Sequence, residues 1–186
     1  MNLNKAISGR RSTRDYTAEP VDEKVILRLI DAATQAPSAM NQQPWTFTVI
    51  RDQALLERIS REAKACMLAT TPVGSHSSHF QSLLSEDSFQ LFYHAPVLVL
   101  ISGNESSQWM VADCALAAQN LMLAAYAEGL GTCWIGFAQG FLNTPEGKHM
   151  LGLPAEWMPV APIIVGHPLS TAVPVAHKAP EIHWIG

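Results

Sequence analysis

The sequence predicts one domain of mixed helices and strands, of the α/β or α+β class. Segments with apolar residues at helical spacing alternate with short β-branched runs, and no internal repeat or linker interrupts them. The length of 186 residues suits a single hydrophobic core. The chain is 48% hydrophobic and 15% charged, whereas about 25% charged is typical of soluble domains. We therefore expect much of its surface to be buried, in the core or against a second subunit.

The first half of the chain contains two predicted helices and one predicted strand. Asp22 is placed to cap a helix that runs to about Gln35. Residues 46–50 form a β-branched and aromatic run typical of a strand, and apolar residues recur at helical spacing over about 52–67. Residues 70–88 have no sustained period, which predicts a loop or cover with room for one short helix.

The long apolar segment 107–128 is predicted to be a helix that ends at Gly129. Residues 96–101 precede it and are continuously apolar, as in a strand buried on both faces. Asp113 and two amide side chains interrupt the apolar segment, which argues against a membrane span and for a core or subunit-contact helix. A buried Asp113 would need a partner, within the chain or across a dimer.

The last third contains two short predicted strands, a short helix and a tail. The strands cover 132–135 and 160–165, and Thr144 before a proline predicts the start of the helix. The tail from residue 169 onward has no period, so we expect it to be ordered only where it docks on another surface.

Basic residues are crowded at the N-terminus. Four of the 12 fall in the first 14 positions, and none lies between Ala65 and Gly147. A mildly acidic chain without a basic stripe is a poor general nucleic-acid binder. The N-terminus has no apolar stretch long enough for a signal peptide, and the three cysteines form no CxxC spacing typical of zinc or disulfide frameworks. These features favour the cytoplasm.

The segment from Arg10 to Arg14 is the first candidate binding site. It holds three guanidinium groups and two hydroxyls, which are donors suited to a phosphate. The alternative is a solvated basic turn. The scarcity of basic residues elsewhere favours a ligand.

The loop 36–45 is the second candidate. Its sequence APSAMNQQPW is stiff, uncharged and rich in amides, which suits the edge of a planar heterocycle. The alternative is an ordinary connection from helix to strand, with its tryptophan in the core.

Three glycines, Gly129, Gly131 and Gly136, form the third candidate. Their spacing is neither the dinucleotide fingerprint nor a P-loop, so by itself it indicates only close backbone approach. His76 and His79 lack further ligands for a metal, and we expect them on a solvent-facing loop or over a substrate.

Together these segments resemble the nitroreductase family of flavin-dependent oxidoreductases. The matching stretches are RRSTRDY, APSAMNQQPW, GLGTCWIG and APIIVGHP, in the family's order. The resemblance implies an α+β sandwich, with a mainly antiparallel sheet flanked by helices. It also implies an intertwined homodimer with FMN at the subunit interface, and a tail, 169–186, that docks on the partner subunit.

The resemblance further implies which residues bind FMN. One group would hold the phosphate, the ribityl chain and the pyrimidine edge, a second would reach FMN from the partner subunit, and a third would face the flavin ring. These groups are Arg10, Arg11, Ser12 and Arg14; Pro37, Ser38, Ala39, Met40, Asn41 and Gln43; and Trp134, Ile135 and Gly136. In the tail, Lys178 stands where the family usually has an arginine on the phosphate.

The activity implied is hydride transfer from NADH or NADPH through flavin N5 to a nitroaromatic, a quinone or a related acceptor, by a ping-pong mechanism. No side chain need act as an acid or base toward the nucleotide, and no metal is expected. The alternatives are a non-catalytic FMN-binding or storage protein, or a different flavin reaction such as dehalogenation or flavin breakdown.

Overall fold

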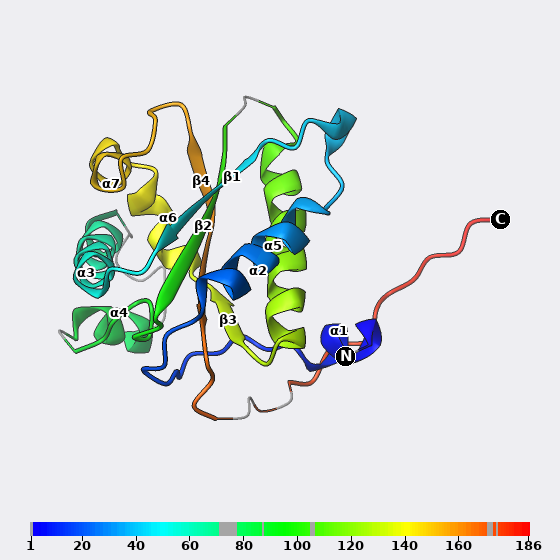
Figure 1. The fold of residues 1–186 in the computed structure, drawn as a ribbon, viewed down its shortest axis with the longest axis horizontal. Helices are drawn as coiled ribbons and strands as arrows, with labels where there is room; N and C mark the ends of the chain where they lie inside the picture. The colour runs from blue at the N-terminus through cyan, green and yellow to red at the C-terminus, as the bar shows by residue number, and fades with distance from the viewer. Residues whose placement is uncertain (1, 71–77, 87, 105–106, 171–172, 174) are drawn as a thin grey trace.

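The chain forms a four-stranded sheet between two layers of helices (Figure 1). The computed structural model describes residues 2–70, 78–86, 88–104, 107–170, 173 and 175–186.

The sheet has the strand order β1-β2-β4-β3. The strands are β1 (Trp45–Ile50), β2 (Val97–Gly103), β3 (Gly131–Trp134) and β4 (Met158–Gly166). Each neighbouring pair runs antiparallel, with Thr48 opposite Leu100 and Val99 opposite Ile163. The predicted strands are therefore confirmed, and the antiparallel pairing confirms the α+β class.

Two helices, α2 (Glu23–Thr34) and α5 (Met110–Ala127), cover one face of the sheet (Figure 1). Alternate residues of β2 point to opposite faces, so Val99 packs in this layer whereas Leu98 packs in the other. Asp22 caps α2 by accepting a hydrogen bond from the backbone N–H of Lys24 at 2.7 Å.

The opposite face is covered mainly by α3 (Gln53–Thr70) and α6 (Gly136–Leu142), with α4 (Ser78–Ser85) and α7 (Pro145–Met150) beside them (Figure 1). The Thr144 side chain caps α7 as the sequence predicts. The predicted loop or cover 70–88 contains α4, and its residues 71–77 and 87 lie outside the described part of the chain.

Two short helices have weak sequence signals and were not predicted. The helix α1 (Leu3–Gly9) buries only Ala6 and begins at Asn2, whose side chain accepts a hydrogen bond from the Lys5 N–H at 2.9 Å. The helix α6 contains two glycines, which are poor helix formers, so its stability comes from packing on the sheet.

The apolar helix α5 has the length and hydropathy of a membrane span. Eight of its 18 residues are buried, and it packs against α2 and the sheet. The helix ends at Ala127, and Gly129 after its C-cap has a φ of 80°, a conformation that glycine adopts without strain. These contacts make α5 the core helix of the domain, as predicted.

Leu29 and Leu27 on α2 provide a matched test of this packing. Leu29 is fully buried and Leu27 is 56% exposed. We expect Leu29→Ala to lower the free energy of unfolding by about 2–5 kcal/mol, because it leaves a cavity against α5. Leu27→Ala should change it by less than about 0.5 kcal/mol. Urea unfolding at one fixed protein concentration measures both, and equal losses would contradict the packing described.

Candidate functional site

The arginine segment lies along the outer edge of the sheet, beside β3. The backbone N–H of Thr13 donates to Thr132 O at 2.9 Å, and Ser12 forms an isolated bridge with Thr132. A Cβ atom on Gly131 would lie 2.6 Å from the Thr13 hydroxyl, so this glycine permits the close approach of the segment. The edge strand therefore fixes the backbone from which the arginines project.

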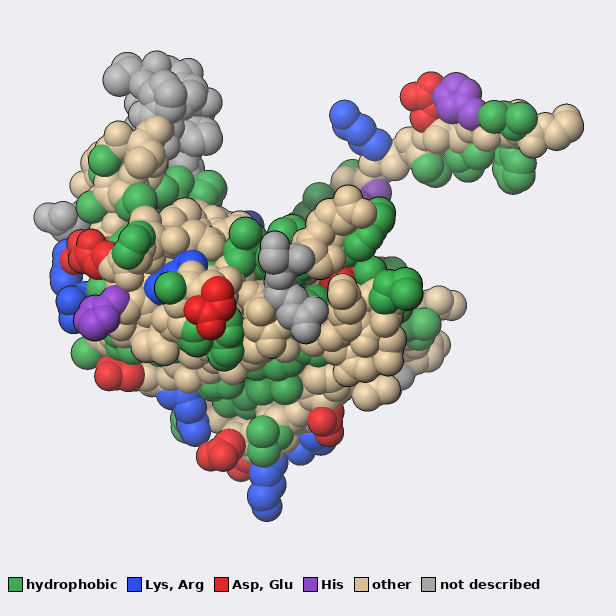
Figure 2. All heavy atoms as spheres, turned by 90° about the horizontal axis from the view of Figure 1, so that it is seen from above, with side chains coloured by type: hydrophobic (Ala, Val, Ile, Leu, Met, Phe, Trp, Pro, Cys, Tyr) green, Lys and Arg blue, Asp and Glu red, His purple; other side chains and the backbone are tan. Residues whose placement is uncertain are grey.

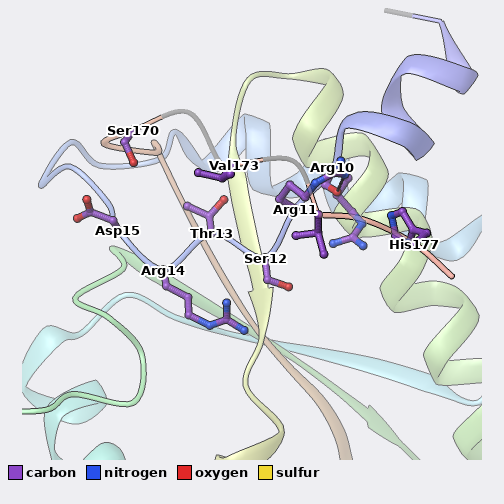
Figure 3. A pocket seen from close by; sticks show the side chains of 10 residues that line it. Arg10, Arg11, Ser12, Thr13, Arg14, Asp15, Ser170, Val173 and His177 are labelled. Atoms are coloured by element: carbon purple, nitrogen blue, oxygen red, sulfur yellow. Dashed lines mark hydrogen bonds between the residues drawn. The ribbon is translucent and has the colours of Figure 1, made fainter.

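An open cavity of about 520 Å³ is built around this segment (Figure 3). The N-terminal segment supplies one wall and the C-terminal tail the other. The lining residues are Arg10, Arg11, Ser12, Thr13, Arg14, Asp15, Ser170, Val173, Val175 and His177. Its size lies in the range of small-molecule sites.

Positive charges outnumber negative ones among the residues that line this cavity. The lining residues carry three guanidinium groups and one carboxylate, that of Asp15. Within the described residues no arginine of the cavity lies within 4.0 Å of a carboxylate oxygen, and the buried Nε atoms of Arg10 and Arg11 have no hydrogen-bond partner. Buried donors without acceptors are costly. The cavity thus has the donor set of an anion site.

Arg11 also has a local role. Its Nη1 donates to Ser8 O at 2.8 Å and to Arg10 O at 2.7 Å, and so satisfies carbonyls at the end of α1. Its Nε is buried and has no hydrogen-bond partner among the described residues.

Arg14 lies among groups that stay neutral near neutral pH. Burial raises the pKa of Tyr93 and of the Cys133 thiol. In both cases the nearby positive charge of Arg14 offsets only part of that rise in pKa. Burial likewise raises the pKa of Tyr16, whose hydroxyl donates to Thr13 O at 2.7 Å. The positive charge of Arg14 is therefore not cancelled by an ionised phenol or thiol.

The loop that contains Pro37 to Gln43 is strained and closed on itself. Met40, Asn41 and Gln43 have φ values of 53°, 56° and 49°, which few residues other than glycine adopt. The Gln43 N–H donates to Ser38 Oγ at 2.9 Å, and the Ala39–Asn41 turn (η1) leaves Met40 93% exposed. The following Trp45 is buried at the start of β1, as the alternative for this loop predicted for its tryptophan.

A hydrogen bond to Asp113 connects this loop to the core helix α5. Asp113 is 4% exposed, and its Oδ1 accepts a hydrogen bond from the Ala39 N–H at 3.1 Å. The partner that the sequence required for a buried Asp113 thus lies in the same chain.

The loop and the arginines lie at opposite ends of α5 (Figure 1). The loop meets the first turn of α5 through Asp113, whereas Arg10 and Arg11 line a second cavity with Tyr126 and Gly129 at the other end. The 18 residues of α5 span about 27 Å. One chain therefore does not bring all the predicted site residues together.

Residues Trp134 to Gly136 lie closer to the arginine cavity. Trp134 is the half-buried last residue of β3, the strand that holds Thr13, and Gly136 is exposed at the start of α6. The Ile135 N–H donates to Pro162 O at 2.8 Å, and Ile135 O accepts from Ala138 N at 3.1 Å. The backbone of Ile135 is thus already engaged within the fold.

The tail places His177 in the cavity lining, and Lys178 is not among the lining residues. The family resemblance pointed to Lys178 as the tail residue on the phosphate, and that role stays a prediction. The sequence carries no signal for His177, because a tail without periodicity does not predict which side chain turns inward. Beyond the cavity the tail extends away from the body of the domain (Figure 2). It leaves Ile182, Trp184 and Ile185 exposed.

Two further predicted features are not described by the structure. His76 and the side chain of His79 lie outside the described residues. Among those that are described, no group of three or more His, Cys, Asp or Glu side chains could hold a metal ion, and all three cysteines are free.

The chain is similar in sequence and in structure to known flavoproteins. A model of the Nitroreductase family matches residues 7–167. A protein of Methanothermobacter thermautotrophicus, whose name joins NADH dehydrogenase and NAD(P)H nitroreductase, is 30% identical over 173 residues, which are 90% of this chain and 78% of the relative. The 5,6-dimethylbenzimidazole synthase of Rhodospirillum rubrum is 26% identical over 196 residues. The alignment covers 99% of this chain and 88% of the relative.

A nitroreductase with bound FMN from Desulfitobacterium hafniense has the same fold. It aligns with a TM-score of 0.84 and 26% identity, and all of both chains is covered. The strand order and helical layers described above therefore belong to a known flavoprotein architecture.

The reactivity of the cysteines tests the burial described for β3 and for α5. Burial, together with the Asp113 charge, raises the pKa of the Cys114 thiol to about 12, and burial raises that of Cys133. Because the thiolate is the reactive form, both should resist alkylation near pH 8, whereas the half-buried Cys66 reacts. A thiol titration should find one fast thiol per native chain and three after denaturation. A second fast thiol in the native protein would contradict these environments.

Proposed function

This chain belongs to the Nitroreductase family, and from that premise we propose that it is an FMN-dependent oxidoreductase that uses NADH or NADPH. The acceptor would be a nitroaromatic, a quinone or a related electrophile, reduced in a ping-pong cycle. Bound FMN would supply the hydride-carrying atom, flavin N5. The side chains of the protein would bind and orient the reactants.

The observation that carries this proposal is the unneutralised arginine cavity. FMN has a phosphate that carries up to two negative charges, and Arg10 and Arg11 each have a buried Nε without a partner in the part of the chain that the structure describes. Charge-assisted hydrogen bonds to such donors contribute about 1.5–3 kcal/mol each. Ser12, which lines the same cavity, would bind the adjoining ribityl chain, and His177 or Lys178 would approach from the tail.

Arg14 would tune the flavin. Reduced flavin carries negative charge on the pyrimidine side of the ring, and a fixed positive charge there favours hydride acceptance. The neighbouring phenols and the Cys133 thiol remain protonated, so they do not cancel this effect.

A second copy of the chain would complete the site. The loop from Pro37 to Gln43 lies at the far end of α5 from the arginines, so it would reach the flavin of a partner rather than its own. The exposed apolar side chains of Leu3, Ile7, Trp109 and Val111 have the character of a surface that an assembly covers. We therefore propose a homodimer, with Trp134 to Gly136 and the arginines supplied by one subunit and the loop by the other.

A second candidate function follows from the dimethylbenzimidazole synthase similarity over nearly the whole chain. It would use the same FMN site for a different flavin reaction, such as flavin breakdown. A storage protein would bind FMN without accepting a hydride.

The decisive measurement is anaerobic reduction of the purified protein. We expect a yellow protein, or one reconstituted by FMN, that loses its visible flavin absorbance on addition of NADH or NADPH and regains it with a quinone. A protein that cannot take up FMN would contradict the assignment. Bound FMN that neither nucleotide reduces would favour the storage protein, and loss of the flavin itself on exposure to oxygen would favour breakdown.

The cavity arginines should determine FMN affinity. We expect Arg10→Ala to weaken FMN binding by about ten- to a hundredfold and the Arg10→Ala, Arg11→Ala double variant to weaken it further, since each lost contact removes about 1.5–3 kcal/mol. Arg58→Ala, on the exposed side of α3, is the matched control. Fluorescence titration of the apoprotein measures all three. Full FMN occupancy of the double variant after gel filtration would refute the phosphate role.

A further inference from the structure

Asp113 is a buried carboxylate in the most apolar helix of the domain. One oxygen accepts from the Ala39 N–H at 3.1 Å, and the other, Oδ2, is buried without a partner among the described residues. A buried ionised group is costly unless it is fully paired. The hydrogen bond from Ala39 offsets part of that cost.

Asp113 contacts the strained loop through this hydrogen bond. Three residues of the loop have positive φ, a conformation that persists only where the surroundings hold it. The bonds within the loop, from Gln43 N to Ser38 Oγ and from Asn41 N to Ser38 O at 3.0 Å, close it on itself but do not fix its position. Of the described hydrogen bonds of residues 38–43, the one from Ala39 to Asp113 is the one that reaches another part of the chain.

We propose that Asp113 is a positioning residue for the cofactor: its carboxylate fixes the 38–43 loop in the conformation that a second subunit's FMN requires. This inference rests on the proposed function. Met40 on this loop is 93% exposed and already has its strained backbone conformation. The entropy cost of ordering the loop would therefore arise on folding and not on FMN binding.

A purely structural role makes a different prediction. Asp113 lies in the first turn of α5, where a negative charge favours the helix dipole. That effect needs the charge and not the contact with Ala39. Asp113→Asn removes the charge and keeps an acceptor oxygen, whereas Asp113→Ala removes both, so the two roles separate.

The control is another α5 side chain that binds backbone elsewhere. The Asn120 Nδ2 donates to Ala32 O at 3.2 Å and so ties α5 to the end of α2. Asn120→Ala removes a hydrogen bond of similar kind without touching the loop.

Two measurements report on the variants: hydrogen exchange of the Ala39 amide in FMN-free protein, and FMN affinity by fluorescence. For Asp113→Ala we expect about tenfold faster exchange and about tenfold weaker FMN binding, the effect of one lost hydrogen bond. Asp113→Asn should restore both to within about threefold of the unmodified protein, and Asn120→Ala should leave both unchanged.

Three results would overturn the proposal: unchanged exchange in Asp113→Ala, equal FMN losses in Asp113→Ala and Asn120→Ala, or an Asp113→Asn variant as defective as Asp113→Ala. Should Asp113→Ala fail to fold, Ala39→Pro removes the donor from the loop side, and it should weaken FMN binding by about tenfold; full affinity would count against the proposal. If the unmodified chain binds no FMN, the proposed function is wrong. The hydrogen exchange of the Ala39 amide still tests whether Asp113 fixes the loop.

Discussion

The packing of α5 against the sheet is the constraint on which the site depends. Its buried residues face α2 on one side and strands β2 and β4 on the other, so the helix is held along its length. Each fully buried large apolar side chain contributes about 1.5–3 kcal/mol, and several lie along this interface. The helix therefore sets the distance between the loop near Asp113 at one end and the arginine segment, which is fixed on β3, at the other.

The charge distribution follows from the same architecture. The stretch from Ala65 to Gly147 without Lys or Arg contains β2, α5, β3 and α6, which supply a large part of the core. The arginines lie outside this core, at the edge strand, where their backbone is pinned by Thr132 and their side chains can stay charged. A chain with little charge thus concentrates positive groups where an anion would neutralise them.

The sequence predicted the strands and the longer helices because their apolar periods are strong, and it indicated the arginines and the 36–45 loop as candidate binding segments. It could not show that these segments lie at opposite ends of one helix, since that depends on tertiary packing. It indicated that Asp113 needs a partner but not that the partner is Ala39. In the tail the family resemblance pointed to Lys178, and no pattern in the sequence indicated that His177 lines the cavity. The short helices α1 and α6 were not predicted because their local helix propensity is too weak.

The separation of the two candidate binding segments has a genetic consequence. In the proposed dimer each site takes its arginines from one chain and its loop from the other. A mixed dimer of a chain that lacks the arginines and a chain that lacks a functional loop would contain one site with both defects and one site with neither. Two individually inactive alleles of this gene would then complement each other within a single molecule, whereas two alleles defective in the same segment would not.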